Sequence, residues 1–252
     1  MSSVFKSGNP TLSTKVFRES VFVGESDRMT VRGTMNKFAI LFLLTIATSS
    51  LAWKVFETGS NLVVLMWPCV LVAIGIAIAL AFKPNWSPYL APVYAITMGF
   101  AIGLVSAVYN NAFEKIAPNI ITQAVALTFG VVLAMYLLYN FKIIQPTQRF
   151  KSIVITATAG LFLFYLIAFI LRLFGITIPF LHEGSTFGII FSLIVVGLAA
   201  MNLILDFDMI EQGSNVGAPK YMEWYGAFGL LVTIVWLYLE ILRLLSKFAS
   251  RK

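Results

Sequence analysis

The sequence predicts an all-α integral membrane protein, a bundle of seven transmembrane helices. Three observations carry this prediction. Hydrophobic residues make up 59% of the 252-residue chain, where soluble domains have about 45–50%. Charged residues make up only 12%, about half the usual share. The apolar residues also form seven continuous runs, each close to the roughly 20 residues that a helix needs to cross a bilayer.

Each run has its own features in the sequence. The first follows a polar segment, so residues 1–36 are interpreted as a cytoplasmic arm and 37–252 as the transmembrane domain. The third contains a GxxxG pattern at Gly99 and Gly103, which is typical of close helix packing. The fourth and fifth flank a basic loop, the sixth ends in acidic residues, and the seventh contains a glutamate. The spans are expected near 37–56, 61–82, 89–109, 118–140, 152–173, 185–206 and 222–247.

The distribution of basic residues predicts the orientation. With the N-terminus inside, 11 of the Lys and Arg residues fall on the inner side and three on the outer side, as the positive-inside rule requires. The four after residue 240 disagree, because seven crossings would place them outside. Either the last span does not fully cross, or earlier helices overrule these late charges; seven full spans are preferred.

Several functional classes are excluded or disfavoured. One cysteine and one histidine exclude a disulfide framework and a multi-histidine metal centre. No phosphate-binding loop, HExxH or GxSxG pattern is present, so no enzymatic activity is expected. The net charge of +7 is explained by orientation, so nucleic acid is not an expected partner. No cofactor is expected beyond transient Ca²⁺.

Two aspartates end the sixth apolar run. Asp206 and Asp208 either mark the helix end at the lipid headgroups or place one carboxylate in the bundle. Asn202 lies one turn before Asp206 on the same helical face, which favours Asp206 as the inward residue and Asp208 as the outward one.

Glu240 lies within the seventh apolar run. A charge at the bilayer centre costs about 2.5–3.5 kcal/mol on insertion scales, so its environment must compensate. One interpretation is an intrahelical ion pair with Arg243 at i+3. The other is a carboxylate pair with Asp206 that shares a proton, senses pH and holds or releases a cation.

The motifs "LDFDMIEQG" (205–213) and "WLYLEILRLL" (236–245) resemble the last two helices of the transmembrane Bax-inhibitor-motif family. "MTVRGTMNK" (29–37) is similar to a bacterial branch of it. Alignment on Ile210 and Gly213 places the family's aspartate on Asp206, and the acidic residue of its last helix falls on Glu240.

The resemblance implies a seven-helix bundle with the last helix at its centre, in the bacterial inner (plasma) membrane. It implies a pH-sensitive calcium or cation leak gated by Asp206 and Glu240, with Asn202, Asp208 and Arg243 as supporting polar residues. The alternative is a regulatory protein that binds a membrane-anchored AAA protease or another membrane partner. The lipid bilayer is the partner expected in either case.

Overall fold

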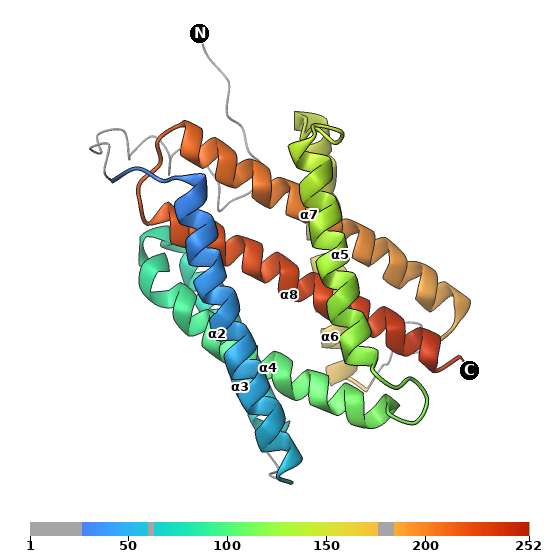
Figure 1. Cartoon of the computed structure of the whole chain (residues 1–252). Coiled ribbons are helices and arrows are strands. Elements are labelled where there is room, and N and C mark those ends of the chain that lie inside the picture. Colours follow the sequence, from blue (N-terminus) through green and yellow to red (C-terminus); the bar gives the residue numbers. More distant parts are fainter. Residues whose placement is uncertain (1–26, 60–62, 176–183, 252) are drawn as a thin grey trace. The chain divides into compact units, whose positions relative to one another are not determined.

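Seven long α-helices make up most of the protein in the computed structural model, which describes residues 27–59, 63–175 and 184–251. All seven are long and apolar enough to cross a membrane, and the described residues contain no strand. The all-α, seven-helix prediction is confirmed. The helices, shown in Figure 1, are α2 (Val31–Glu57), α3 (Val63–Phe82), α4 (Ser87–Phe113), α5 (Ile120–Asn140), α6 (Gln148–Leu173), α7 (Thr186–Asn215) and α8 (Met222–Ala249), with a short 3₁₀ turn η3 (Pro84–Trp86).

Two helix boundaries differ from the prediction by more than four residues. Helix α2 begins at Val31, not near 37, because the Thr30 side chain accepts a hydrogen bond from Gly33 N–H and caps the helix. Half a dozen residues assigned to the arm are therefore helical. Helix α7 continues to Asn215, beyond the predicted end at 206. Hydropathy marks where apolar residues stop, whereas a helix ends where its backbone hydrogen bonds stop.

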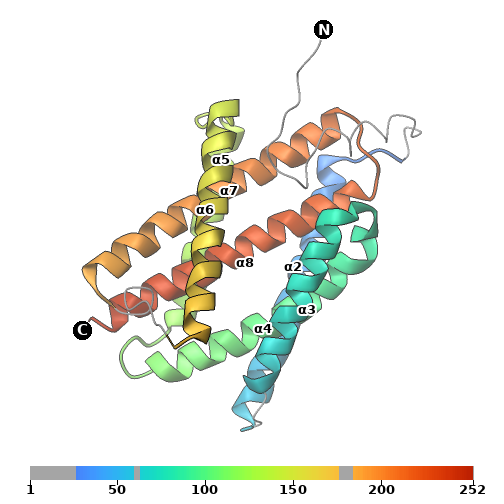
Figure 2. The ribbon, with the colours of Figure 1, turned by 180° about the vertical axis from the view of Figure 1, so that it is seen from behind.

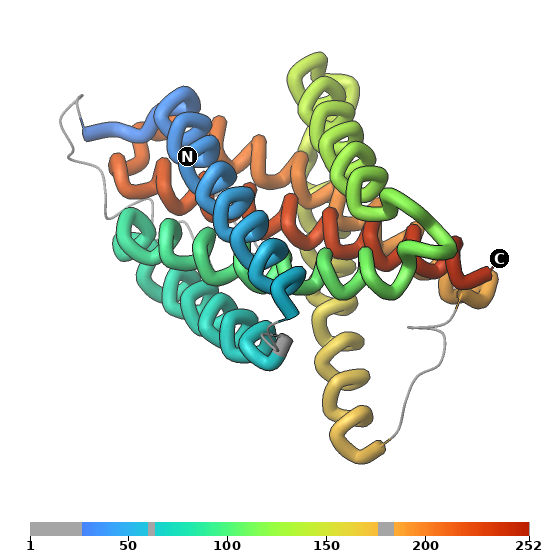
Figure 3. Tube along the Cα trace, turned by 60° about the horizontal axis from the view of Figure 1, so that its bottom comes forward, coloured from blue at the N-terminus to red at the C-terminus, as the bar shows by residue number. Residues whose placement is uncertain are grey.

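The chain divides into two compact units. The first comprises residues 1–108 and 206–232, and the second comprises residues 109–205 and 233–252. The chain passes from one unit to the other within α4, α7 and α8. Helix α8 is nevertheless a single uninterrupted helix, drawn in red in Figure 3.

In the first unit, α2 and α4 pack with their backbones in close contact. A Cβ on Gly99 would lie 2.6 Å from the Thr45 carbonyl oxygen of α2, and one on Gly103 would lie 2.8 Å from Ser49 Cα. Both separations are too short for a side chain, so only glycine fits at these positions. The close packing predicted from the GxxxG pattern is thus confirmed. Helix α4 also contacts α8, where the Tyr94 and Phe228 rings meet edge to face at a centroid distance of 4.9 Å.

In the second unit, α6 contacts α7 and α8 while exposing most of its own surface (Figure 2). The Asn202 amide of α7 donates to Thr158 Oγ1 of α6 at 2.9 Å, and the Phe164 and Phe191 rings lie 5.6 Å apart. Residues of α8 such as Leu237, Ile241 and Leu242 are buried. The core of this unit therefore lies along α8.

The exposed surfaces of α3, α5 and α6 consist mainly of large apolar side chains, including Leu71, Leu133 and Phe162. Such surfaces are compatible with lipid hydrocarbon and incompatible with water over this area. The chain is a multi-pass membrane protein whose spanning helices contact the bilayer.

Candidate functional site

Glu240 makes its polar contacts inside the second unit. Its side chain is only 4% exposed, and Arg243 donates to its two carboxylate oxygens at 2.8 and 3.0 Å. The Tyr165 hydroxyl of α6 donates to Glu240 Oε1 at 3.3 Å and accepts from Arg243 at 2.9 Å. The ion pair expected from the i,i+3 spacing is present, and Tyr165 adds a partner from another helix.

Asp206 lies within α7, nine residues before the helix ends at Asn215. It therefore does not mark the end of the helix, which was one of the two interpretations. Its carboxylate oxygen Oδ2 is buried. At 1.5 Å per residue, about 13 Å of helix separates Asp206 from the terminus, so the carboxylate belongs to the body of the helix.

The neighbouring polar residues of α7 have partners of their own. Asn202, expected on the face of Asp206, donates to Thr158 Oγ1 and to the Leu198 carbonyl, both at 2.9 Å. Asp208 accepts a hydrogen bond from Gln212 Nε2 at 2.7 Å in an exposed position.

Asp206 belongs to the first unit and Glu240 to the second. The pairing of these two carboxylates, and the gate that would rest on it, stay predictions. What the structure brings together in the second unit is Glu240 with Arg243 and Tyr165.

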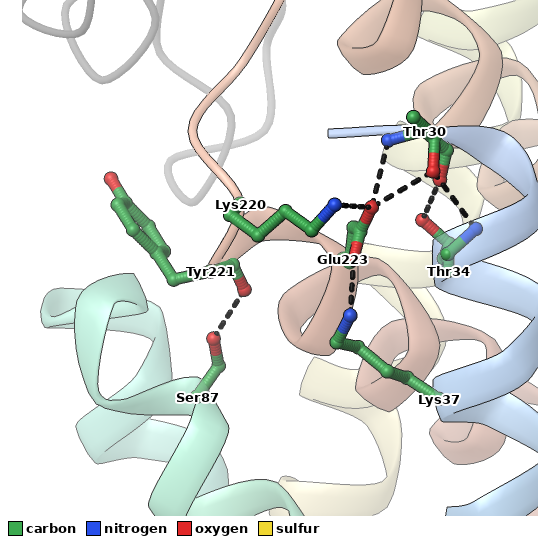
Figure 4. Close-up of polar contacts among 8 residues, drawn as sticks. Thr30, Thr34, Lys37, Ser87, Lys220, Tyr221 and Glu223 are labelled. Carbon is green, nitrogen blue, oxygen red and sulfur yellow. Dashed lines mark hydrogen bonds and ion pairs between the residues drawn. The ribbon is translucent and has the colours of Figure 1, made fainter. Parts of the chain in front are cut away.

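A second buried carboxylate, Glu223, lies at the start of α8 in the first unit (Figure 4). Its side chain is 0% exposed. Its Oε1 accepts from Thr30 N–H and Thr30 Oγ1, both at 2.9 Å, and lies 3.5 Å from Lys220 Nζ. Its Oε2 accepts from Lys37 Nζ. We call these four residues, Thr30, Lys37, Lys220 and Glu223, the Glu223 clasp.

Local sequence explains why a carboxylate fits at the start of α2. The N-terminus of a helix carries unpaired N–H groups and a partial positive charge, which favour an anion. Gly33 leaves the space, because a Cβ at this position would overlap the Glu223 carboxylate. Thr30 accepts from Gly33 N–H at 2.9 Å while its hydroxyl proton is donated to Glu223. The threonine thus caps α2 and binds the glutamate at once.

Beside the clasp, a serine hydroxyl binds the backbone next to α8. Ser87 Oγ at the start of α4 donates to the Tyr221 carbonyl at 2.9 Å, which fixes the residue before α8. Tyr221 lies outside the spanning helices, and burial raises the pKa of its phenol above the usual value. At neutral pH the phenol is uncharged, so it adds no charge to this region.

Lys247 is buried near the end of α8. Its ammonium group donates to the Gly188 carbonyl at 3.0 Å and to Ser192 Oγ at 2.9 Å, both on α7. The sequence had counted this lysine among the basic residues of the C-terminal tail. It is instead 2% exposed and connects two helices.

Comparison with known families adds the identity of the fold. The family model described as Bax inhibitor 1 like matches residues 9–250. The chain belongs to this family. The match covers nearly the whole chain, so the resemblance inferred from the last two helices extends to all seven. A comparison with curated proteins finds no match.

Sequence reasoning about this Bax inhibitor family protein missed the Glu223 clasp. Glu223 lies at the edge of the predicted seventh span, and Lys37 is one of the basic residues that predict the orientation. These two residues are 186 positions apart, and an acidic residue in the first turn of a helix is usually explained by the helix dipole alone. Thr30 is a typical capping residue three positions before a glycine, so the sequence could have indicated a helix start there. It could not have indicated that Glu223 binds at this helix start.

Proposed function

We propose that this Bax inhibitor family protein is a pH-sensitive cation leak channel. It conducts Ca²⁺ across the bacterial inner (plasma) membrane, with its N-terminus in the cytoplasm. The observation that carries the proposal is Glu240, a buried glutamate within a membrane-spanning helix. Ionisable residues inside spans are costly, and they typically mark ion or proton pathways.

Asp206 and Glu240 are the proposed gating carboxylates. Arg243 and Tyr165 hold Glu240 in one position, and Asp206 has one oxygen buried in α7. Protonation of a carboxylate removes an acceptor charge and adds a donor. It therefore changes which partners the group binds, and that change is the proposed route from pH to leak. The protein has no proposed enzymatic activity, and Ca²⁺ is the conducted ion, not a resident cofactor.

Purified protein reconstituted in liposomes tests this proposal through Ca²⁺ release measured over a range of pH. Wild-type protein should release Ca²⁺ in a pH-dependent manner, and Asp206→Asn should change that dependence. Glu114→Gln is the control, because Glu114 is an exposed carboxylate of the α4–α5 connection that has no proposed role in the leak. Absence of flux at every pH overturns the proposal.

Glu240→Gln needs a check on folding, because it leaves Arg243 without its charged partner inside the unit. Glu240→Asp keeps the charge on a shorter side chain and serves as the companion variant. Altered pH dependence in Glu240→Gln, with wild-type thermal stability, assigns Glu240 to the gate.

One observation favours a second candidate, a regulatory protein that binds a membrane-anchored AAA protease or another membrane partner. Both oxygens of Glu240 are bound by Arg243, which competes with proton sharing. Removal of residues 1–26 would leave Thr30 and the cap of α2 in place. This truncation should abolish co-purification of the partner, and full-length protein that captures nothing argues against this candidate.

A further inference from the structure

The residues just before α2 are attached to the connection between α7 and α8. Met29 N–H donates to the Ala218 carbonyl at 2.6 Å, and Lys220 N–H donates to the Asp27 carbonyl at 2.8 Å. Residues 27–30, which we call the docked segment, thus pair with this connection in a short antiparallel arrangement. The Glu223 clasp lies directly beside this pairing, because Thr30 belongs to both.

Glu223 adds a second connection between the docked segment and α8 through its carboxylate. Its carboxylate is fully enclosed, so water does not solvate it and only its partners compensate for its burial. Those partners come from three places: Thr30 in the docked segment, Lys37 in α2 and Lys220 before α8. Loss of the negative charge would leave two ammonium groups and a helix N-terminus facing one another, which repel.

Helix α8 carries both Glu223 and Glu240. Glu223 is in its first turn, and the helix continues without a break to Ala249, past Glu240. The 17 residues from Glu223 to Glu240 span about 25 Å of helix. The clasp and Glu240 therefore lie on the same helix.

We propose that the Glu223 clasp is a regulatory lock, which fastens residues 27–30 to the α7–α8 connection, holds α8 in its resting position and is released to allow α8 to move. The effect on ion leak rests on the proposed function. The lock itself is a property of the first unit and has a readout that needs no ion flux.

Cysteine accessibility in the full-length chain measures the lock directly. Met29 is 4% exposed, so Met29→Cys, in a Cys69→Ala background, should react slowly with a water-soluble maleimide. Glu223→Gln should raise the labelling rate about tenfold or more, because labelling follows the population of the open state. The control Glu114→Gln makes the same chemical change at an exposed residue of the α4–α5 connection and should leave the rate unchanged. An equal rate in Glu223→Gln and wild type overturns the proposal.

Lys37→Met guards against a variant that fails to fold. It removes one ammonium group, keeps the length of the side chain and leaves Lys220 and Thr30 bound to Glu223. A partial rise in labelling, smaller than in Glu223→Gln, is the expected result. No rise in Lys37→Met, with both variants folded, contradicts the ion pair as part of the lock.

A disulfide tests the connection to α8. Met29 and Ala218 are opposite one another in the antiparallel pairing, a separation that suits a disulfide. The protein with Met29→Cys, Ala218→Cys and Glu223→Gln is reconstituted in liposomes. When oxidised, it should show the wild-type leak, because the disulfide replaces the lock. After reduction, it should show the altered leak that Glu223→Gln causes. Measurable Ca²⁺ flux in the Glu223→Gln variant of this double-cysteine protein that is identical under oxidised and reduced conditions contradicts the lock. Normal labelling results with no flux in any sample support the lock and overturn only the channel proposal.

Discussion

At the scale of single residues, Gly33 and Glu223 fit together across two helices. The glutamate carboxylate occupies the volume that any side chain at position 33 would fill. That carboxylate also binds Thr30, Lys37 and Lys220, and moving it would break these contacts. Glycine is therefore required here by the space it leaves, not by backbone conformation.

Gly33→Ala should destabilise the protein by about 1–3 kcal/mol, the cost of displacing a buried carboxylate from its hydrogen bonds. Thermal unfolding in detergent measures the change. Gly160→Ala provides the matched control, because Gly160 is an exposed glycine of α6 with nothing within 4 Å of the added Cβ. This control should raise stability by about 0.5–1 kcal/mol through helix propensity. Equal effects of the two substitutions would contradict the fit described for Gly33.

Residue-level prediction from the sequence succeeded where partners are local. The Glu240–Arg243 pair follows from helical spacing alone, since residues three apart on a helix are neighbours. Tyr165, 75 positions from Glu240, and Lys37, 186 positions from Glu223, were not predictable. Their proximity depends on how the helices pack, and no periodicity in a single sequence records that.

At the scale of helices, Lys247 is a charged residue that is buried and connects two helices. Its ammonium group binds Gly188 and Ser192 of α7. The Gly188 carbonyl lies in the first turn of α7, so it also has an intrahelical partner. Ser192 Oγ is a side-chain acceptor that a substitution can remove, whereas the Gly188 carbonyl remains.

The two sides of this contact should therefore respond differently to substitution. Ser192→Ala leaves a buried ammonium group with fewer acceptors and should cost roughly 1–3 kcal/mol. Lys247→Met removes the buried charge, and with it the repulsion from Arg243 one turn earlier, and should change stability by less than about 1 kcal/mol. Thermal unfolding of both variants in the same detergent decides between them. A larger loss in Lys247→Met would show that the ammonium group stabilises the helix pair.

Helix boundaries were predicted well where the helix stops with its apolar run, and poorly where the helix continues into polar sequence. The start of α8 at Met222 and the end of α5 at Asn140 match the expected spans. At these two boundaries the helix and the apolar run start or stop at the same residue. The start of α2 and the end of α7 were missed, because the helices extend through polar residues. Thr30 and its bond to Gly33 N–H fix the first of these, which is a capping effect that hydropathy does not measure.

At the scale of the whole chain, the number of spans was predictable and their contacts were not. Each span is long and apolar in its own right, and a bilayer requires backbone groups to be satisfied within the segment. The count therefore follows from local sequence. The Glu223 clasp, the Tyr165 contact and the α2–α4 packing partners all depend on tertiary structure.

The contacts of the basic residues near the C-terminus also change how these residues count in predicting the orientation. Arg243 binds Glu240, and Lys247 is enclosed between α7 and α8. This leaves Arg251 and Lys252 as the basic residues beyond the helix. A short tail with two charges opposes an outer C-terminus less than four charges would.

Seven full crossings predict termini on opposite sides of the membrane. Alkaline phosphatase fused after Lys252 should be active and green fluorescent protein at the same site dark, because the proposed cytoplasmic N-terminus and seven crossings place the C-terminus outside. The same reporters fused after Gln145, in the α5–α6 connection, should give the reverse result. A fluorescent C-terminal fusion would indicate an even number of crossings, or an inverted chain if the Gln145 fusions are reversed as well.

The fit between Gly33 and Glu223 also has a genetic consequence. If the harm of a methyl group at position 33 comes from the carboxylate it displaces, that harm should shrink in a chain whose residue 223 has a small side chain. The two positions are then epistatic. A screen for suppressors of Gly33→Ala should return substitutions at position 223, near the other end of the chain. Among natural variants, glycine at 33 should be free to change only where the glutamate has already been lost.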